Sequence, residues 1–582
     1  MVILSFNFGH DGSACLLSDG KVLAAIASER VTRRKKQRGV TIEVVEYLLK
    51  KAKMGFDDIS LVTAVNWFSD CDPMTGNDLS DKYLNGFFLR YQGRDLTREE
   101  YADRRENFFG DLKMNIYGHW FDCILVDHHF AHCCYAFFMS PYKDAITLSI
   151  DFNDNFGTDH SIGYFDSNHN YIRIRHGGDF VVGSLYGCIC DYLGFYPSLI
   201  DAGKVMGLAA YGTPHPDFKR LSWGLEAQSL TRDPYLSLLL AFGIKEVPDR
   251  RILYPQLKGE KGVPDDRWLN KADWDEELNR NIAATVQAIL EESVCNLVKA
   301  IAEETKDLSR NLCLSGGTML NCVCNGKILD LGLFDSIYAA PACGDEGLSM
   351  GAALGVAHLL HRKDKYYPSV LETFEGGFTY TDAQILSAIL KHVDEIRFLR
   401  MSEDDLIDSA INAIIDGKIL AWFEGGSEIG PRALGHRSII VDPRRGDMKD
   451  ILNARVKHRE PFRPFAPAVL AEMAGEWFDI KESPYMLFSV RCLKPELIPA
   501  TSHVDGSARV QTVDAENNGR YYKLIKEFYR QTEVPVLLNT SFNDNGEPIV
   551  ETPANAVACF LKTEIDAMVI GDFYLEKKQR SE

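Results

Sequence analysis

A strand–turn–strand pattern occurs twice in this chain of 582 residues and limits its fold more than any other feature. The first copy has apolar strands near Val2–Phe8 and Ala14–Leu17, then an Asp-Gly turn and a third strand at Lys21–Ala27. The second copy lies in Ala145–Phe165, where AITLSID is followed by a glycine-containing turn and HSIGYF. Asp-Gly between apolar runs is a strong hairpin signal. Each copy presents Asp and Gly at its turn.

Duplication of this unit indicates a mixed α/β (α+β) fold of the class that contains actin, the heat-shock ATPases and the sugar kinases. In that class the two turns face a nucleotide from opposite sides. Helical periods follow the copies, with Ile42, Val45 and Leu48 on one face and Ile282 and Val286 on another. The later strand NLCLSGG ends in glycines, which let backbone N–H groups approach a phosphate closely.

The length of the chain predicts at least two domains, and its 46% hydrophobic content is that of a globular protein. A polar run over 360–382 indicates a junction, so we expect one domain at 1–368 and another at 369–582. A helix capped by Ser402, with Asp405 at the capping-box position, follows this junction.

The location of the protein is predicted from what its sequence lacks. The amino terminus has no basic leader, which argues against a signal peptide, and no segment has the apolar length of a membrane span. The 14 cysteines are dispersed and lack the CxxC spacing of zinc sites, which favours reduced, buried thiols. We expect a cytoplasmic protein without a membrane partner.

A basic segment spans residues 424–467, in a chain whose formal net charge is −19. Its cations lie among Gly and Pro rather than along a helical stripe. Arginine holds planar oxyanions such as carboxylate, phosphate or carbamate through two parallel hydrogen bonds. We therefore interpret the segment as an anion pocket. Its basic residues are Arg432, Arg437, Arg444, Arg445, Lys449, Arg455, Lys457, Arg459 and Arg463.

Two other interpretations of this basic segment stay open. Its arginines can form surface ion pairs with neighbouring acids. A nucleic-acid groove is the second alternative, but such a groove would spread basic residues along the fold with interleaved aromatics. The acidity of the whole chain also disfavours a polyanionic partner, so we expect no nucleic acid.

A candidate metal site is indicated by the motif Asp127-His128-His129-Phe130-Ala131-His132. His128 and His132 have the i, i+4 spacing that places two imidazoles on one helix face. Asp151, after the second strand unit, and Asp345, in the motif ACGDEG, supply carboxylates. Such a set suits Fe(II), Mn(II) or Zn(II) better than Cu(I). Paired histidines also line cores, and Asp151 can be a simple turn residue.

Two further sites are indicated at the ends of strands. His10, beside Asp11, follows the first strand and could supply a base at the nucleotide turn. The basic run after Glu29 is either solvated or in contact with a phosphate or carbamoyl group. The strand in PVLLNTSFNDNG ends in Asn539, Thr540 and Ser541, whose hydrogen-bonding groups are typical of a small-molecule site.

These motifs together resemble those of the antibiotic-type and nodulation-type O-carbamoyltransferases, and the likeness covers almost the whole chain in the same order. The matching segments are GHDGSA, SERVTRRKK, DHHFAH, DAGKVMGLAAYG, LSGGTMLN, CGDEG, GPRALGHRSI, VKHREPFRPFAPAVL, HVDGSARVQTV and LLNTSFNDNGEPIV.

The resemblance implies an amino-terminal domain similar to the tRNA threonylcarbamoyl-transfer proteins and a carboxy-terminal YrdC-like domain. It implies that carbamoyl phosphate and ATP, with Mg²⁺, form carbamoyladenylate in the second domain. A hydroxyl of a small-molecule acceptor then attacks the carbamoyl carbon in the first domain, and AMP leaves.

The resemblance also assigns residues by motif. The metal, usually iron in this family, would be held by His128, His132, Asp151 and Asp345. The nucleotide would contact Gly316, Gly317 and Asn321, with Lys35 neutralising the adenylate and His10 as candidate base. In the second domain ATP and carbamoyl phosphate would be bound by Arg432, Arg463, Arg509, Asn539 and Ser541.

Two competing functions differ in class from this prediction. A tRNA threonylcarbamoyl-type transferase is disfavoured by the acidic charge and by the fused second domain. A non-enzymatic, ATP-binding actin-like scaffold would leave the second domain without a purpose. The acceptor is a natural product or a glycan, bound by loops within 66–105, 180–199 or 213–273, and a homodimer is compatible with the resemblance.

Overall fold

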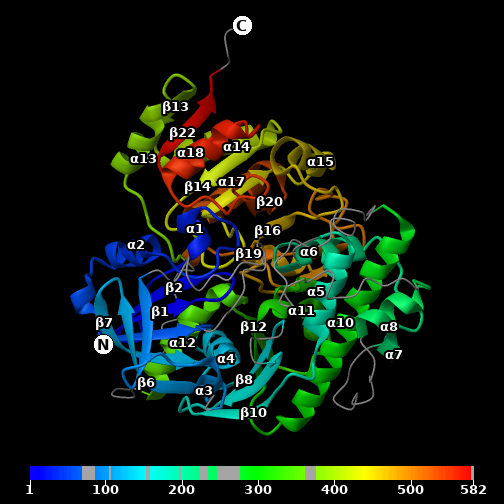
Figure 1. Cartoon of the computed structure of the whole chain (residues 1–582). Helices are drawn as coiled ribbons and strands as arrows, with labels where there is room; N and C mark the ends of the chain where they lie inside the picture. The colour runs from blue at the N-terminus through cyan, green and yellow to red at the C-terminus, as the bar shows by residue number, and fades with distance from the viewer. Residues whose placement is uncertain are drawn as a thin grey trace. The chain divides into compact units, whose positions relative to one another are not determined.

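The computed structural model describes residues 1–67, 86–103, 106–152, 157–195, 198–221, 234–244, 275–360 and 375–578. The chain forms two compact units (Figure 1). The first comprises Met1–Leu23 and Lys36–Val370, and the second comprises Ala24–Lys35 and Leu371–Glu582. The second unit thus takes a short segment from near the amino terminus. The expected junction at 368 lies outside the described residues, as does much of the expected acceptor loops within 66–105 and 213–273. The expected loop within 180–199 is instead mostly helix α5 (Val182–Tyr192).

The first unit contains a seven-stranded sheet with the order β3-β2-β1-β4-β7-β6-β5, whose edge strand β3 ends in residues assigned to the second unit. β1 is antiparallel to β2 and parallel to β4, which is parallel to β7. Asp19 and Gly20 join β2 to β3 with positive φ angles of 48° and 79°, as a two-residue hairpin turn requires. The strands are β1 (Val2–Asn7), β2 (Ser13–Ser18), β3 (Lys21–Ala27), β4 (Leu61–Val65), β5 (Phe87–Tyr91), β6 (Phe108–Ile116) and β7 (His119–Val126).

A five-stranded sheet in the same unit repeats this topology with the order β10-β9-β8-β11-β12. β8 is antiparallel to β9 and parallel to β11, which is parallel to β12. The duplicated α/β core predicted from the two strand units is therefore confirmed. The strands are β8 (Ala145–Ile150), β9 (His160–Phe165), β10 (Tyr171–Gly177), β11 (Asn311–Ser315) and β12 (Ser336–Ala339).

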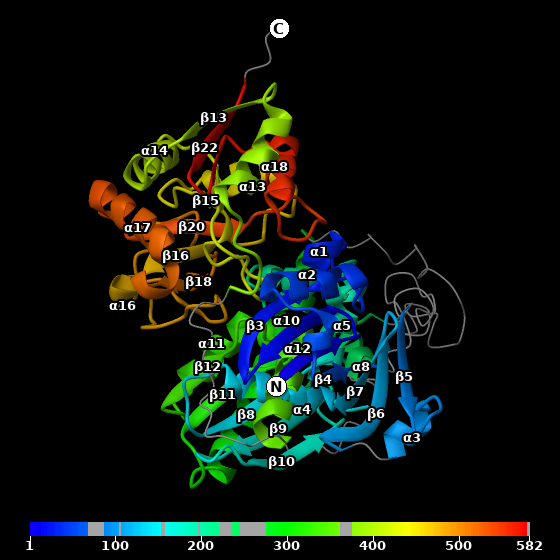
Figure 2. The ribbon, with the colours of Figure 1, turned by 90° about the vertical axis from the view of Figure 1, so that its left-hand side faces the viewer.

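Two helices each pack on the sheet of the other half of this unit. Helix α4 (His128–Phe138) follows β7 of the first sheet but packs on β8 and β11 of the second. Helix α12 (Leu348–Gly355) comes after β12 of the second sheet but packs on β1 and β2 of the first. The two helices contact each other and lie side by side (Figure 1, Figure 2).

Glycines make the contact between α4 and α12 close. A Cβ atom at Gly351 would lie 2.0 Å from the carbonyl oxygen of Ala131, and one at Gly355 would lie 2.9 Å from Cys134 Sγ. These two glycines are four residues apart and share one face of α12. Any side chain there would push the helices apart.

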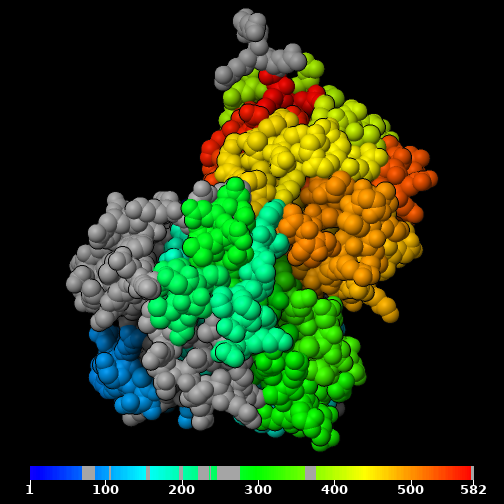
Figure 3. Space-filling model, turned by 90° about the vertical axis from the view of Figure 1, so that its right-hand side faces the viewer, coloured from blue at the N-terminus to red at the C-terminus, as the bar shows by residue number. Residues whose placement is uncertain are grey.

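The other helices of the first unit surround the two sheets. Helices α5, α6 and α10 pack on one another, and α6 and α10 are adjacent on the surface of this unit (Figure 3). The remaining helices are α2 (Ile42–Ala52), α3 (Arg98–Asp103), α5 (Val182–Tyr192), α6 (Ser198–Ala209), α7 (Phe218–Leu221), α8 (Pro234–Ala241), α10 (Glu277–Glu304) and α11 (Cys322–Asp330).

The second unit is built on an eight-stranded sheet with the order β13-β22-β21-β14-β15-β20-β16-β19. β17 (Ser489–Arg491) and β18 (Ser507–Arg509) form a separate pair. The strands of the main sheet are β13 (Ile396–Arg400), β14 (Leu420–Phe423), β15 (Arg437–Val441), β16 (Ala466–Leu470), β19 (Gln511–Val513), β20 (Val536–Ser541), β21 (Ala567–Ile570) and β22 (Phe573–Lys577).

The helices of the second unit include the one predicted after Ser402, whose side chain accepts a hydrogen bond from Asp405 N. An earlier helix, capped by Thr381, was not predicted. The helices are α1 (Ser28–Thr32), α13 (Asp382–Ile389), α14 (Glu403–Ile415), α15 (Met448–Leu452), α16 (Ala474–Trp477), α17 (Ala515–Thr532) and α18 (Pro553–Lys562).

Helix α1 is tied to the second unit by two arginines. Arg33 donates to the carbonyl oxygens of Ile549 at 2.6 Å and Pro548 at 2.7 Å. Arg30 donates to the carbonyl oxygen of Gly430 at 3.0 Å. These hydrogen bonds explain why a segment numbered among the first residues belongs to the second unit.

No helix in the described part of the chain is long and apolar enough to cross a membrane. The cysteines among the described residues are all buried and unbridged, as their dispersed spacing predicts.

We expect Gly351→Val to destabilise the first unit, because the new side chain meets the backbone of α4. Overpacking of a close contact costs about 1–3 kcal/mol. Chemical denaturation measures the free energy of unfolding. Gly110→Val is the control, since Gly110 is exposed on β6 and has nothing within 4 Å of an added Cβ. Equal stability of the two variants would contradict close packing of α4 on α12.

Candidate functional site

The four residues predicted to hold a metal are brought together in the first unit. His128 and His132 lie one turn apart on α4, whose N-terminus is capped by Asp127. Asp151 directly follows β8, and Asp345 lies in the short turn that leads into α12. One ligand atom from each of the four lies within 4.8 Å of the others. We call these residues the His/Asp cluster.

Both imidazoles of the His/Asp cluster face both carboxylates. His132 Nε2 lies 3.1 Å from Asp151 Oδ2 and 3.4 Å from Asp345 Oδ1. His128 Nε2 lies 3.7 Å from each of the same two oxygens. The exposed fraction of the side chains is 10% or less. Four nitrogen and oxygen donors thus converge away from solvent.

The charges of the His/Asp cluster stabilise one another. Burial alone would raise the pKa of Asp151, but the imidazoles of His128 and His132 beside it hold this pKa well below its usual range. Burial alone would lower the pKa of His132, but its hydrogen bond with Asp151 and the nearby carboxylate of Asp345 raise it. The Asp151 carboxylate therefore stays ionised, as a metal ligand must be.

Two features of the His/Asp cluster fit a divalent transition metal. The buried Oδ1 of Asp345 points at both imidazoles but has no hydrogen-bond partner of good geometry among the described residues. Two imidazoles and two carboxylates are ligands that Fe(II), Mn(II) and Zn(II) accept. A cation would satisfy this oxygen and compensate both buried charges.

Gly316 and Gly317 hold Asp151 in place. Gly317 N–H donates to Asp151 Oδ2 at 2.8 Å. Gly316 has a φ of 94°, and a Cβ there would lie 2.2 Å from the carbonyl oxygen of Ile150. Both glycines therefore lie beside the His/Asp cluster, where backbone N–H groups can approach a ligand.

Asn321, the third residue predicted to contact a nucleotide, has structural partners. Its Oδ1 accepts from Cys324 N at 3.0 Å, which caps α11, and from Gln287 Nε2 at 3.1 Å. Its Nδ2 donates to Gln287 Oε1 at 2.9 Å. The amide of Asn321 thus joins α10 to α11.

The predicted base, His10, contacts the His/Asp cluster directly. His10 Nε2 lies 3.4 Å from Asp345 Oδ2, and its Nδ1 lies 3.2 Å from Asp11 Oδ2. Lys36 Nζ lies 2.8 Å from the Asp11 carboxylate. Burial lowers the pKa of His10, but Asp345 and Asp11 outweigh this effect and raise it to about 9. A cation bound by Asp345 would reduce that effect and lower the pKa of His10.

Sequence reasoning missed several residues around this cluster. Burial, together with the charge of Asp11, raises the pKa of Glu346 to about 7. Asn7 and Asn66 form hydrogen bonds with the turn around His10 and with His128. The only signal for Asn7 is its place at the end of the first strand.

The basic segment of the second unit contains two kinds of side chain. Some arginines form ion pairs or backbone hydrogen bonds that stabilise the fold, and others lie close to one another. Arg444 pairs with Asp442, Arg445 with Asp447, and Arg455 with Glu564 and Asp566. For these three arginines the ion-pair alternative holds, since each has a carboxylate within reach.

Arg437 is structural for a different reason. Its side chain is fully buried, its guanidinium lies 3.5 Å from the centre of the Phe423 ring, and it donates to the carbonyl oxygens of Glu424 and Gly425. The interpretation that places Arg437 in an anion pocket is wrong, because its guanidinium N–H groups bond to backbone carbonyls of the loop between β14 and β15.

Three guanidiniums, of Arg459, Arg463 and Arg509, form what we call the arginine cluster. Burial lowers the pKa of Arg459 well below its usual range, and the charges of Arg463 and Arg509 lower it further. The three side chains are half-buried, and Glu460 Oε2 lies 3.6 Å from Arg463 Nη1. One carboxylate does not offset three like charges, so an anion would stabilise the cluster. Arg459 is one of the basic residues that the sequence placed in an anion pocket, but it is not among those that the resemblance assigns.

Lys457 extends the arginine cluster. Its buried ammonium donates to Ser541 Oγ at 3.3 Å and to Asn543 Oδ1 at 2.8 Å. Burial lowers the pKa of Lys457 well below its usual range, and Arg459, Arg463 and Lys35 add to this effect. The structure thus places Lys35 in the second unit, near Lys457.

The other residues predicted for this unit lie nearby in the fold. Asn539 Nδ2, on β20, donates to the carbonyl oxygen of Ala433 at 3.1 Å. This bond holds the loop between β14 and β15, which carries Arg432. Ser541 Oγ donates to Asn543 Oδ1 at 2.6 Å. Ser541 is therefore beside Lys457, and Asn539 acts on the loop of Arg432.

Comparison with known proteins gives consistent matches over the chain. A family model described as Carbamoyltransferase N-terminus matches residues 2–354, and one described as Carbamoyltransferase C-terminus matches residues 411–577. The chain is 32% identical to nodulation protein NolNO of Sinorhizobium fredii, over 99% of this chain and 80% of that protein. It is 27% identical to 3'-hydroxymethylcephem-O-carbamoyltransferase of Amycolatopsis lactamdurans, over 100% of both.

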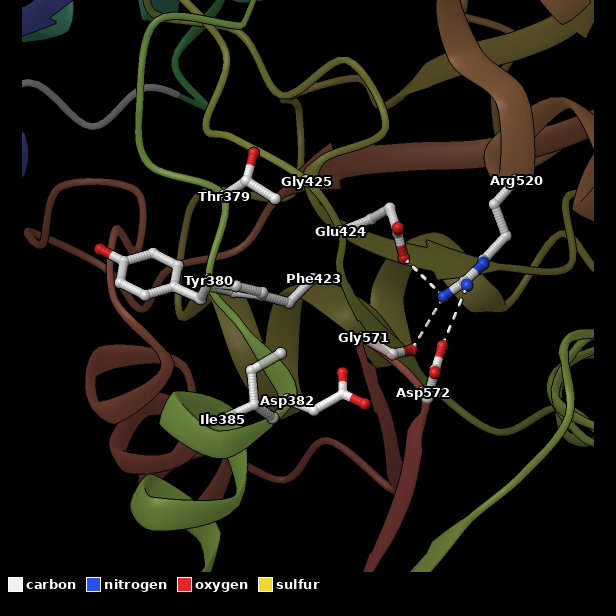
Figure 4. A pocket seen from close by; sticks show the side chains of 10 residues that line it. All are labelled: Thr379, Tyr380, Asp382, Ile385, Phe423, Glu424, Gly425, Arg520, Gly571 and Asp572. Atoms are coloured by element: carbon white, nitrogen blue, oxygen red, sulfur yellow. Dashed lines mark hydrogen bonds and ion pairs between the residues drawn. The ribbon is translucent and has the colours of Figure 1, made fainter. Parts of the chain in front are cut away.

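The second unit also has a cavity of about 130 Å³ beside Arg520 (Figure 4). Arg520 donates to Glu424 Oε2 at 2.9 Å, to the carbonyl oxygen of Gly571 at 3.0 Å and to Asp572 Oδ1 at 3.0 Å. Burial, together with the Asp572 charge, raises the pKa of Glu424 to about 6 although Arg520 opposes this. Glu424 therefore binds its proton more tightly in the folded state than in the unfolded state.

We expect Glu424→Gln to change how stability depends on pH. The stabilisation from protonated Glu424 is complete below pH 4.5, the ordinary pKa, and is lost as pH rises through about 6. Gln keeps an acceptor for Arg520 but does not titrate. As pH rises from 4.5 to 7.5, the free energy of unfolding of the variant should therefore increase relative to that of the wild type by up to about 2 kcal/mol.

Denaturation at several pH values, with exposed Glu476→Gln as control, measures this difference. An identical pH profile for wild type and Glu424→Gln would contradict the raised pKa.

Proposed function

This chain belongs to the carbamoyltransferase family, and on that basis we propose that it forms carbamoyladenylate from carbamoyl phosphate and ATP and carbamoylates a hydroxyl of a small molecule. The observation that carries the proposal is the arginine cluster, where three guanidiniums and Lys457 are crowded and Glu460 offsets only part of their charge. Two polyanionic substrates would supply that charge.

The first half-reaction belongs to the arginine cluster. Water releases phosphate from carbamoyl phosphate and leaves carbamate. A carbamate oxygen then attacks the α-phosphorus of ATP, whose bond to the bridging oxygen of pyrophosphate breaks. Arg459, Arg463 and Arg509 would bind the phosphates and stabilise the charge that develops on the leaving pyrophosphate. Mg²⁺ would accompany ATP.

The other cations of the second unit have supporting roles in this proposal. Lys457 and Lys35 add positive charge beside the arginine cluster. Ser541 and Asn543 hold the ammonium of Lys457, and Asn539 holds the loop that presents Arg432. The YrdC-like character of this unit is part of the same proposal.

The second half-reaction belongs to the His/Asp cluster. The acceptor hydroxyl attacks the carbamoyl carbon, the bond from that carbon to the phosphate oxygen breaks, and AMP leaves. His10, oriented by Asp11, would take the hydroxyl proton. Gly316 and Gly317 would offer backbone N–H groups to the adenylate.

A metal held by His128, His132, Asp151 and Asp345 would orient the adenylate phosphate and neutralise its charge as AMP leaves. Fe(II) is the metal we propose. A cephem alcohol is the acceptor of one relative, judged by its name, so we propose a secondary metabolite or glycan hydroxyl as the acceptor here.

We expect Arg459→Ala and Arg463→Ala each to lower pyrophosphate release about 100-fold, because each removes a donor to the developing charge. The assay uses Mg-ATP with and without carbamoyl phosphate. Arg445→Ala is the control, since Arg445 pairs with Asp447 on the surface. Pyrophosphate release that does not depend on carbamoyl phosphate would refute the adenylation step. Release at the wild-type rate in both Arg459→Ala and Arg463→Ala would also refute it.

We expect His132→Ala, or removal of the transition metal by a chelator that is itself removed before Mg-ATP is added, to abolish carbamoyl transfer and leave pyrophosphate release intact. The His/Asp cluster and the arginine cluster belong to different units, so the two half-reactions should separate. Mass spectrometry of trapped carbamoyladenylate measures the first step. Loss of both steps together would argue against this division.

A further inference from the structure

We propose that Asn7 and Asn66 are positioning residues that fix which ring nitrogen of His128 faces the His/Asp cluster. The inference rests on the metal site of the proposed function. Asn7 is the last residue of β1, and Asn66 comes directly after β4, the parallel neighbour of β1. The two amides therefore meet at the same edge of the sheet.

The orientation of the Asn7 amide is determined by its partners. Its Nδ2 donates to three carbonyl oxygens, of His10 at 3.2 Å, Asp11 at 3.2 Å and Asp345 at 3.0 Å. Its Oδ1 accepts from Gly9 N–H at 2.9 Å. Carbonyls only accept and an N–H only donates, so a flipped amide would lose all four contacts.

Asn7 determines the orientation of Asn66 in turn. Asn66 Nδ2 donates to Asn7 Oδ1 at 3.0 Å, which leaves Asn66 Oδ1 facing His128 Nδ1 at 3.1 Å. Because an amide oxygen only accepts, the proton of His128 must be on Nδ1. The lone pair of His128 is therefore on Nε2, the atom that faces Asp151 and Asp345.

The hydrogen-bond chain links two parts of the cluster that are far apart in sequence. Histidines that bind metals donate their other N–H to a second group, which fixes the tautomer and the ring. Here that group is itself held by Asn7, which also holds the backbone of Asp345. One amide thus positions a ligand from each half of the duplicated core.

Gly9 provides the space for this hydrogen-bond chain. A Cβ at Gly9 would lie 2.6 Å from Asn66 Nδ2 and 3.1 Å from Asn7 Oδ1. The φ of Gly9 is not in the left-handed region, so alanine can adopt its backbone conformation. Gly9→Ala should therefore displace Asn66 without refolding the turn.

The experiment measures the affinity of the full-length protein, freed of metal, for Co²⁺ by competition with a chelator. We expect Asn66→Leu and Asn66→Asp to weaken binding about 10- to 100-fold. The aspartate variant is informative because it keeps an acceptor for His128 but turns its other oxygen toward Asn7 Oδ1. Asn296→Asp on α10 is the control, since it makes the same change of charge away from the cluster.

Gly9→Ala tests the same hydrogen-bond chain from a second residue, with exposed Gly110→Ala as its control. We expect weaker Co²⁺ binding and an altered visible spectrum of bound Co²⁺, with little change in the melting temperature of the metal-free protein. If Asn66→Leu does not fold, Gly9→Ala decides the question.

Three results would overturn the inference. Unchanged affinity in Asn66→Leu or in Gly9→Ala would show that the chain does not position His128. Tighter Co²⁺ binding by Asn66→Asp would contradict the proposed direction of the hydrogen bond from Asn66 to Asn7. A wild-type protein that binds no Co²⁺ would instead remove the metal from the proposed function, and pyrophosphate release would then be tested separately.

Discussion

The close contact of α4 with α12 is the constraint on which the first unit depends. Each helix packs on the sheet of the other half, and glycines on α12 let the two backbones approach. The same contact brings His128 and His132, on α4, to Asp345, at the start of α12. Stability and site geometry therefore share one interface, since moving the helices apart would separate the ligands.

The two charged clusters differ in how their charge is compensated. In the His/Asp cluster the imidazoles and carboxylates offset one another, and Asp345 Oδ1 remains without a hydrogen-bond partner among the described residues. In the arginine cluster the neighbours are mostly of the same sign. The first arrangement suits a small cation in a fixed place, and the second suits anions that arrive and leave.

Much of the fold follows from local sequence. The repeated strand–turn–strand units, the Asp-Gly turn and the Ser402 cap depend on neighbours in the chain, and each prediction is confirmed. The spacing of His128 and His132 also predicts a shared face, because it is set by the helix period.

The parts of the site that sequence did not predict depend on burial and distant contacts. Arg437 and Arg459 are equivalent in a basic run, yet one stacks on Phe423 and the other joins two arginines. Nothing in the sequence separates them, because only the tertiary fold decides which carbonyl or cation each one meets. Asn7 and Asn66 were missed for the same reason. Their partners lie up to 338 positions away.

The segment Ala24–Lys35 shows that the two units are not consecutive modules. The second unit includes a helix encoded near the amino terminus, and Arg30 and Arg33 of that segment supply hydrogen bonds to three of its carbonyl groups. A fragment that starts after the expected junction would lack this helix and leave those carbonyls without these donors. Separation of the chain at that junction would therefore divide the second unit and leave one of its helices on the other fragment.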